Sequence, residues 1–120
     1  MSRWIWIAAA FGATGVILGA FGAHALEARL EAEALASWRT AVQYQLIHAV
    51  ALLALALRSA EGGPQIRLPA WLFSLGITLF SGSIYLLILT TQRWPGPLTP
   101  LGGLCFIAGW VSLATLTRRA

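Results

Sequence analysis

Four long apolar segments, separated by short polar breaks, account for most of this chain of 120 residues. They cover residues 4–26, 39–57, 70–91 and 99–117. A helix needs about 20 apolar residues to cross the hydrocarbon core of a bilayer, and lipid offers no hydrogen-bond partner to an open backbone. The pattern therefore predicts an all-α, polytopic integral membrane protein, a single domain of four transmembrane helices in an antiparallel bundle.

Composition supports this class and excludes others. Hydrophobic residues make up 58% of the chain and charged residues only 10%, far from the balance of a soluble domain. The net charge of +4 comes from arginines near the ends of the apolar segments and forms no basic stripe with interleaved aromatics. Nucleic-acid binding is therefore not expected. Cys105 is the only cysteine, so an intrachain disulfide is impossible.

The first apolar segment has an alternative interpretation as a secretory signal peptide. Arg3 resembles a positive n-region, and Ala23-His24-Ala25 loosely fits a small-x-small cleavage site. The apolar run from Trp4 to Leu26 is longer than the usual signal-peptide core. We therefore expect a retained transmembrane helix.

The second segment combines apolar length with polar side chains that hydrocarbon does not tolerate without partners. At the helical repeat of about 3.6 residues, one stripe consists of Ala41, Gln45, His48 and Leu52. Arg39 and Gln43 fall on another, roughly opposite stripe. We expect the first stripe to face the bundle and the second to point toward the headgroups.

The third segment carries hydroxyl groups along one helical face, and we group them with the polar stripe of the second segment. The candidate intramembrane polar cluster comprises Gln45, His48, Thr78, Ser81 and Tyr85. Such groups either hydrogen-bond neighbouring helices together or line a polar pathway. The first interpretation is favoured.

Small residues follow one face of the first and fourth segments. The predicted packing residues are Gly12, Gly15, Gly19, Gly22, Gly102 and Gly109. Small residues let helix backbones approach closely in lipid, so we expect the two faces to pack on each other. The alternative is a pore or ligand groove lined by this smooth surface.

Two further features concern the membrane boundary. Residues 27–37, EARLEAEALAS, predict a short amphipathic helix between the first two spans, at the membrane surface or continuing the first span into water. Five tryptophans stand near span ends, as interfacial anchors do: Trp4, Trp6, Trp38, Trp71 and Trp94.

The distribution of arginines predicts the orientation. Four spans place both termini and the middle loop on one side, which holds Arg3, Arg58, Arg67, Arg118 and Arg119. The other side holds Arg29, Arg39 and Arg93. The positive-inside rule then places the N- and C-termini in the cytoplasm.

Four motifs carry a resemblance to a known family. They are GAFGAHAL (residues 19–26), TAVQYQLIHAVALL (40–53), LFSGSIYLL (79–87) and TPLGGLCFIAGW (99–110). Together they resemble the signature segments of the membrane-protein family known as domain of unknown function 423, which is similar to eukaryotic transmembrane protein 256. The resemblance implies a four-helix inner-membrane protein in bacteria. It implies no activity and no catalytic residues.

The two histidines are the remaining chemical candidates. Imidazoles on neighbouring helices can ligate haem from both sides, but His24 lies near the end of the first span and His48 about 10 residues inside the second. No His, Cys or carboxylate set recurs at metal-binding spacing. We expect no cofactor, no metal and no enzyme activity. A structural His48, bonded to Tyr85, Ser81 or a carbonyl, is the favoured interpretation, and a role in proton or solute movement is the alternative.

Two functions remain open at this point. The first is a structural or accessory subunit, or an assembly partner, whose glycine faces bind other helices. The second is an oligomeric channel or transporter for a small solute or protons that uses the polar faces of the second and third spans. The expected partners are the lipid bilayer and either a second copy of the chain or other membrane proteins.

Overall fold

The computed structural model describes residues 2–60 and 65–117, and all regular structure within them is helical. The elements are α1 (Ser2–Phe21), η1 (Gly22–Leu26), α2 (Ala32–Ala60), α3 (Arg67–Gly76), η2 (Ile77–Ser81), α4 (Gly82–Thr90), α5 (Leu98–Ser112) and α6 (Ala114–Thr117). The labels η1 and η2 denote π-helical turns, which continue α1 and join α3 to α4. Gly62, Gly63, Pro64, Arg118 and Arg119 lie outside the described residues.

Within the described residues, four continuous helices are long and apolar enough to cross a membrane. They are Arg3–Leu26, Ala32–Ser59, Arg67–Thr90 and Leu98–Leu116. The shortest has 19 residues, which at about 1.5 Å per residue matches a hydrocarbon core of about 30 Å. The four predicted spans are confirmed, with the second starting earlier than expected.

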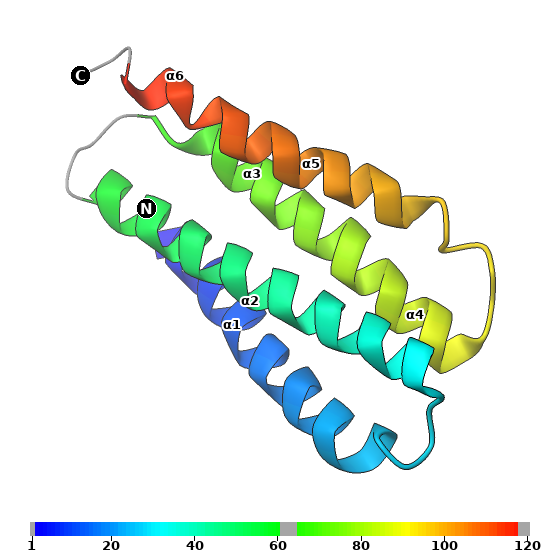
Figure 1. Ribbon diagram of the computed structural model, residues 1–120. Coiled ribbons are helices and arrows are strands. Elements are labelled where there is room, and N and C mark those ends of the chain that lie inside the picture. Colours follow the sequence, from blue (N-terminus) through cyan, green and yellow to red (C-terminus); the bar gives the residue numbers. More distant parts are fainter. Residues whose placement is uncertain (1, 61–64, 118–120) are drawn as a thin grey trace.

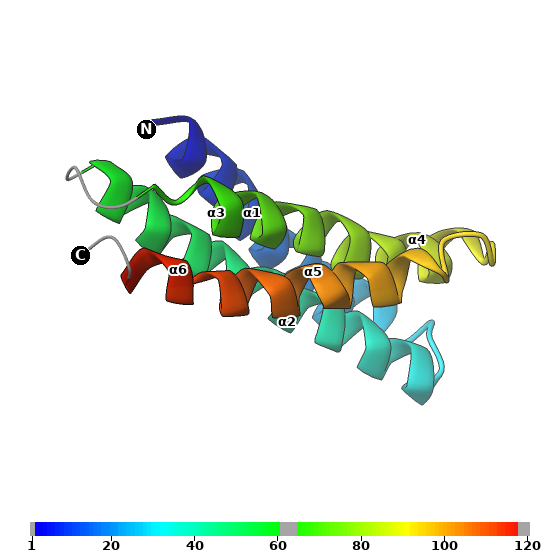
Figure 2. The same ribbon diagram turned by 90° about the horizontal axis from the view of Figure 1, so that it is seen from above.

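The helices form an antiparallel bundle in which α2 has a central place. One side of α2 packs against α1, and another against the continuous helix of α3, η2 and α4. The fourth span, α5, packs against α3 and η2. Figure 1 shows α1 and α5 at opposite edges of this arrangement. Seen from above in Figure 2, α5 lies toward the viewer and α1 passes behind the other helices.

The helix boundaries correct one expectation. Residues 27–31 form a turn and not part of an amphipathic helix, with the amides of Arg29 and Leu30 bonded to the Leu26 carbonyl. Residues 32–37 are the first turns of α2. Leu35 and Trp38 are buried in an apolar cluster with Leu26 and Val42, and this burial extends α2 beyond its apolar run.

The glycine contacts correct a second expectation, because the glycine faces of the first and fourth spans do not meet. A Cβ built on Gly15 or Gly22 would lie 2.7 or 2.6 Å from side-chain atoms of α2, Leu46 and Trp38 respectively. On Gly109 it would lie 2.6 Å from Phe73 of α3, and on Gly102 it would clash with the backbone of Phe80. The glycine face of the first span therefore packs on α2, and that of the fourth span packs on the third span.

Two predicted packing residues behave differently from this group. Gly19 is less crowded, since its Cβ would lie 3.2 Å from a Val42 methyl group. Gly12 has no atom within 4 Å of such a Cβ and is outside the packed seam. Gly76, which the sequence did not single out, is instead covered by the Phe106 ring, with which a Cβ at this position would clash.

Trp38 is the third correction. Its side chain is fully buried, and its indole N–H donates to the Leu18 carbonyl of α1 at 2.9 Å. The ring also packs on Tyr85, with 4.8 Å between centroids. Trp38 is therefore a core residue joining α1, α2 and α4, whereas Trp6, Trp71 and Trp94 are exposed as the anchor interpretation expects.

Candidate functional site

The polar stripe of α2 faces the bundle, as its spacing indicates. Ala41, Gln45, His48 and Leu52 are all at most 4% exposed. Arg39 and Gln43, on the other stripe, are exposed. The periodicity of 3.6 residues thus places the amide and the imidazole in the interior and the guanidinium outside.

Gln45 connects three helices through its side-chain amide. Its Nε2 donates to the Phe11 carbonyl at 2.9 Å and to the Thr14 hydroxyl at 2.8 Å, both on α1. Its Oε1 accepts a hydrogen bond of 2.7 Å from the Tyr85 hydroxyl on α4. Both amide donors and the acceptor oxygen are therefore engaged.

His48 lies one turn further along α2 but has a different set of partners. Its Nδ1 is 2.7 Å from the Tyr44 carbonyl, and the indole N–H of Trp110 on α5 donates to its Nε2 at 2.9 Å. A carbonyl only accepts and an indole N–H only donates. The two bonds therefore specify the neutral imidazole with its proton on Nδ1.

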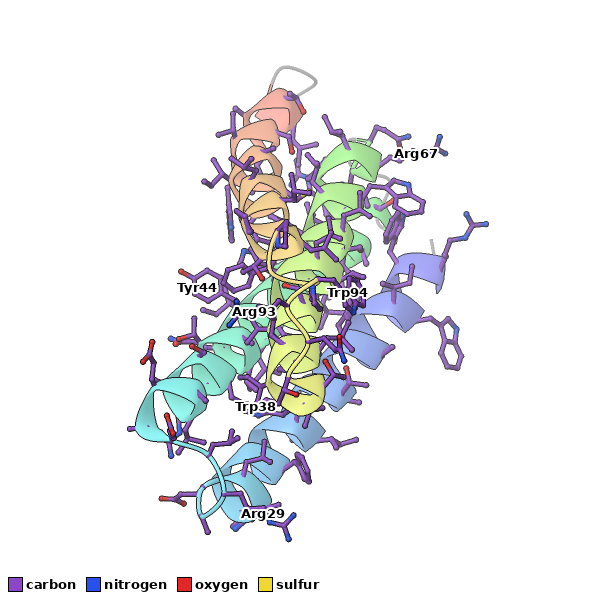
Figure 3. The ribbon with its side chains drawn as sticks, turned by 90° about the vertical axis from the view of Figure 1, so that its right-hand side faces the viewer. Arg29, Trp38, Tyr44, Arg67, Arg93 and Trp94 are labelled. Atoms are coloured by element: carbon purple, nitrogen blue, oxygen red, sulfur yellow. The ribbon has the colours of Figure 1, made fainter. Side chains whose placement is uncertain are left out.

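Aromatic rings surround this imidazole. The Phe106 ring stacks on His48 with 3.7 Å between centroids and 12° between planes. Phe73 and Trp110 approach at 5.4 and 5.8 Å in edge-to-face geometry. Tyr44, labelled in Figure 3, flanks the imidazole at 6.0 Å. The environment is an aromatic cage and contains no carboxylate among the described residues.

The predicted five-residue cluster is divided in the structure. Gln45 and Tyr85 bond to each other, whereas His48 bonds to Trp110 and its own helix. Ser81 is fully buried and donates to the Ala41 carbonyl at 2.7 Å. Thr78 is exposed and bonds only to the Ser74 carbonyl of its own helix. These groups do not form one continuous polar surface.

Sequence reasoning missed several members of these networks. Trp110 is not among the tryptophans near span ends and was assigned no role from the sequence. Phe11 contributes a backbone carbonyl, which no sequence pattern reveals. Thr14 bonds both to its own helix and to Gln45. A polar residue inside an apolar run was the available signal for Thr14.

His24 does not join His48. It is exposed in η1, at the end of the first span, and both ring nitrogens of His48 are occupied by protein groups. The described residues contain no group of three or more His, Cys, Asp and Glu side chains suited to a metal ion. They also leave no buried side-chain nitrogen or oxygen without a hydrogen-bond partner.

The fold and these interior contacts define a class, the polytopic membrane proteins with four transmembrane helices. Residues 18–103 match the family model described as protein of unknown function (DUF423). This chain belongs to that family, so the expected resemblance is confirmed. The matched range includes Trp38, Gln45, His48 and Tyr85 but excludes Trp110.

Curated relatives carry the same description of a membrane protein. The chain is 43% identical to the UPF0382 membrane protein of Staphylococcus haemolyticus over 82% of this chain and 81% of that protein. It is 40% identical to the UPF0382 membrane protein of Haemophilus influenzae, over 94% of this chain and 91% of that protein. It is also 40% identical to a UPF0382 membrane protein of Schizosaccharomyces pombe, over 91% of this chain and 97% of that protein. No solved structure matches.

Proposed function

We propose that this membrane protein is a structural or accessory subunit, without catalytic activity of its own, that packs against transmembrane helices of a partner protein or a second copy. One observation supports this most directly. The outward stripe of α1 carries three small residues, Ala9, Ala13 and Ala20, all exposed, beside the larger Val16 and Ile17. Small residues on a transmembrane face allow close approach of another helix.

The outward faces of other helices differ from this stripe. On α2 they present Ile47 and Val50, and on α5 Leu104, Ile107 and Val111, each at least 48% exposed. Beside the α1 stripe, an apolar groove of about 260 Å³ runs between α1 and α2 and includes Gly12. Large aliphatic side chains suit lipid contact, so the three alanines of the α1 stripe make this the face that we expect another helix to approach.

The interior contacts favour this proposal over the channel alternative. A polar pathway needs side chains that can bind a passing solute, but Gln45, Tyr85 and His48 are occupied by protein partners. The buried hydroxyl of Ser81 is likewise bonded to a backbone carbonyl of α2. The presence of these polar groups is better explained by the hydrogen bonds that they form between helices.

Photo-cross-linking in native membranes tests the proposal. A cysteine replaces Ala13 in a Cys105→Ala background and is modified with a maleimide–diazirine reagent. We expect a discrete protein adduct at this position and none at a matched Val111→Cys control, because Val111 belongs to the lipid-facing aliphatic surface. Adding Ala9→Leu should abolish the adduct by filling the contact. Equal cross-linking at both positions, or none at Ala13, would contradict the proposal.

We also propose an inner-membrane location with both termini in the cytoplasm. The arginine distribution supports it, although Arg118 and Arg119 lie outside the described residues. Single cysteines at Ser2 and Ser59 in the Cys105→Ala background should resist an impermeant thiol reagent in intact cells and react after permeabilisation. Labelling of either position from outside intact cells would show that the predicted orientation is wrong.

A further inference from the structure

A polar cavity lies at the end of the bundle where α1 begins, α2 ends and α3 begins. Its volume is about 680 Å³. The lining residues relevant here are Arg3, Trp4, Ser59, Gln65, Arg67 and Trp71. We call this the arginine pocket. Three separate helix ends contribute to it, so it depends on the assembled fold.

The charge of the arginine pocket is positive and uncompensated within the described residues. Arg3 and Arg67 are both exposed, and neither forms an ion pair with another described residue. No carboxylate is among the described lining residues. A guanidinium offers paired N–H donors whose geometry matches the oxygens of a phosphate. Ser59 and Gln65 add a hydroxyl and an amide as further donors.

The pocket lies at the depth where lipid headgroups are found. Arg3 and Arg67 are the first residues of two candidate membrane spans, and Ser59 is the last residue of another. Figure 3 labels Arg67 at the start of α3, on the side of the bundle where α1 lies. Residues at span ends stand next to the phosphate layer of a bilayer, outside the hydrocarbon core.

Two tryptophans strengthen this placement. Trp4 of α1 and Trp71 of α3 contact each other edge to face, with 5.5 Å between ring centroids. Indole rings favour the headgroup level of a membrane, where one edge is polar and the face is apolar. The pair joins the helix starts that carry Arg3 and Arg67, and both arginines line the same pocket.

The opposite end of the bundle has different chemistry. One cavity there is lined by Glu31 and Glu33 and contains no arginine among its described lining residues. Another, beside Gly19 and Trp38, is lined by the single arginine Arg39. Among the described residues, two arginines around a single cavity are therefore found only at the end where Arg3 and Arg67 lie. This difference between the two ends indicates that a cavity with two arginines does not arise wherever arginines stand at span ends.

We propose that the arginine pocket binds the phosphate group of an anionic phospholipid, with Arg3 and Arg67 as its principal ligands. This inference is independent of the proposed helix-packing function. Basic pockets between transmembrane helices are suited to acidic headgroups. A lipid places its phosphate at the pocket while its acyl chains remain in the bilayer, whereas a free phosphate ion would have only the polar contacts.

The test measures lipid retention by the purified full-length protein with native mass spectrometry. Phosphatidylglycerol and phosphatidylcholine are compared as probes, and inorganic phosphate is added in a separate arm. We expect phosphatidylglycerol to be retained in preference to phosphatidylcholine and to resist displacement by inorganic phosphate. The double variant Arg3→Gln, Arg67→Gln should bind phosphatidylglycerol at least about tenfold more weakly, as expected for the loss of hydrogen bonds to a charged group.

Arg58→Gln is the matched control. It removes one arginine near the same end of the bundle, but Arg58 does not line the arginine pocket, so affinity should change less than about twofold. Circular dichroism and size-exclusion chromatography establish that each variant is folded. Three results would overturn the proposal: equal retention of both lipids, an equal loss in Arg58→Gln, or arginine-dependent binding of inorganic phosphate without preference for the anionic lipid.

Discussion

The two sides of α2 are held to their neighbours by different means. Toward α1, the glycines leave backbone carbonyls within reach, and side chains of α2 bond to them: Trp38 to Leu18 and Gln45 to Phe11. Toward α5, aromatic rings fill the space and the interhelical bond joins two side chains, Trp110 and His48. Close backbone approach makes carbonyls available as acceptors, whereas bulky rings shield the backbone and leave recognition to side chains.

The largest effect should come from filling the close contact with α1. In Gly22→Leu even the Cβ would lie 2.6 Å from the ring of Trp38, which is fully buried. We expect a loss of about 1 to 3 kcal/mol in the free energy of unfolding, measured in detergent. Gly12→Leu is the control, because no atom lies within 4 Å of its Cβ position. Equal losses in both variants would show that the close contact is not at Gly22.

The next effect concerns the polar bonds on the same side. Gln45→Leu removes the bonds to Phe11, Thr14 and Tyr85. At about 0.6 kcal/mol for an interhelical hydrogen bond in a membrane protein, we expect a loss of about 2 kcal/mol. Gln43→Leu is matched in chemistry but exposed, and should change stability by less than about 0.5 kcal/mol. Similar losses in the two variants would argue against the Gln45 network.

On the α5 side, His48→Leu should cost less than Gln45→Leu, because only one interhelical hydrogen bond is lost together with the Phe106 stacking. We expect about 1 to 1.5 kcal/mol, given the usual worth of a stacked aromatic pair. His48→Gln keeps a donor and an acceptor and should fall between wild type and His48→Leu in thermal stability. Equal stability of all three proteins would remove His48 from the set of stabilising contacts.

The smallest effect isolates the bond between Trp110 and His48. Trp110→Phe keeps an aromatic ring but removes the indole donor. A double-mutant cycle with His48→Leu should give a coupling free energy of about 0.6 kcal/mol. The cycle of Trp110→Phe with Gln45→Leu should be additive, because these residues belong to different networks. Strong coupling in the second cycle would mean that the two sides of α2 act as one unit.

The positions of individual side chains were only partly predictable. The periodicity of the second segment correctly placed Gln45 and His48 inside and Arg39 outside, because a helix converts spacing directly into direction. It did not reveal that Tyr85 would donate a hydrogen bond to Gln45 and Trp110 one to His48. Those choices depend on the rotation and depth of α4 and α5 relative to α2, which no local pattern encodes.

The π-helical turn η2 shows why such rotations escape a sequence pattern. It occupies Ile77–Ser81 inside the third span, and the amide of Gly82 bonds to the Ile77 carbonyl five residues back. A π turn changes the angular position of every residue that follows it relative to an uninterrupted α-helix. Faces drawn at 3.6 residues per turn therefore lose their register at this turn, and within it Thr78 is exposed whereas Ser81 is buried.

The sequence by itself determined the class, the four spans and the inward stripe of α2, because hydrophobic length and helical period are properties of the chain alone. Only the tertiary structure decided the partners. It packed Gly22 on Trp38 and Gly102 on Phe80, and not one glycine face on the other. The physical reason is that small residues permit close approach without specifying which helix approaches. That choice depends on complementary shapes and hydrogen-bond partners that come together only when the helices are assembled.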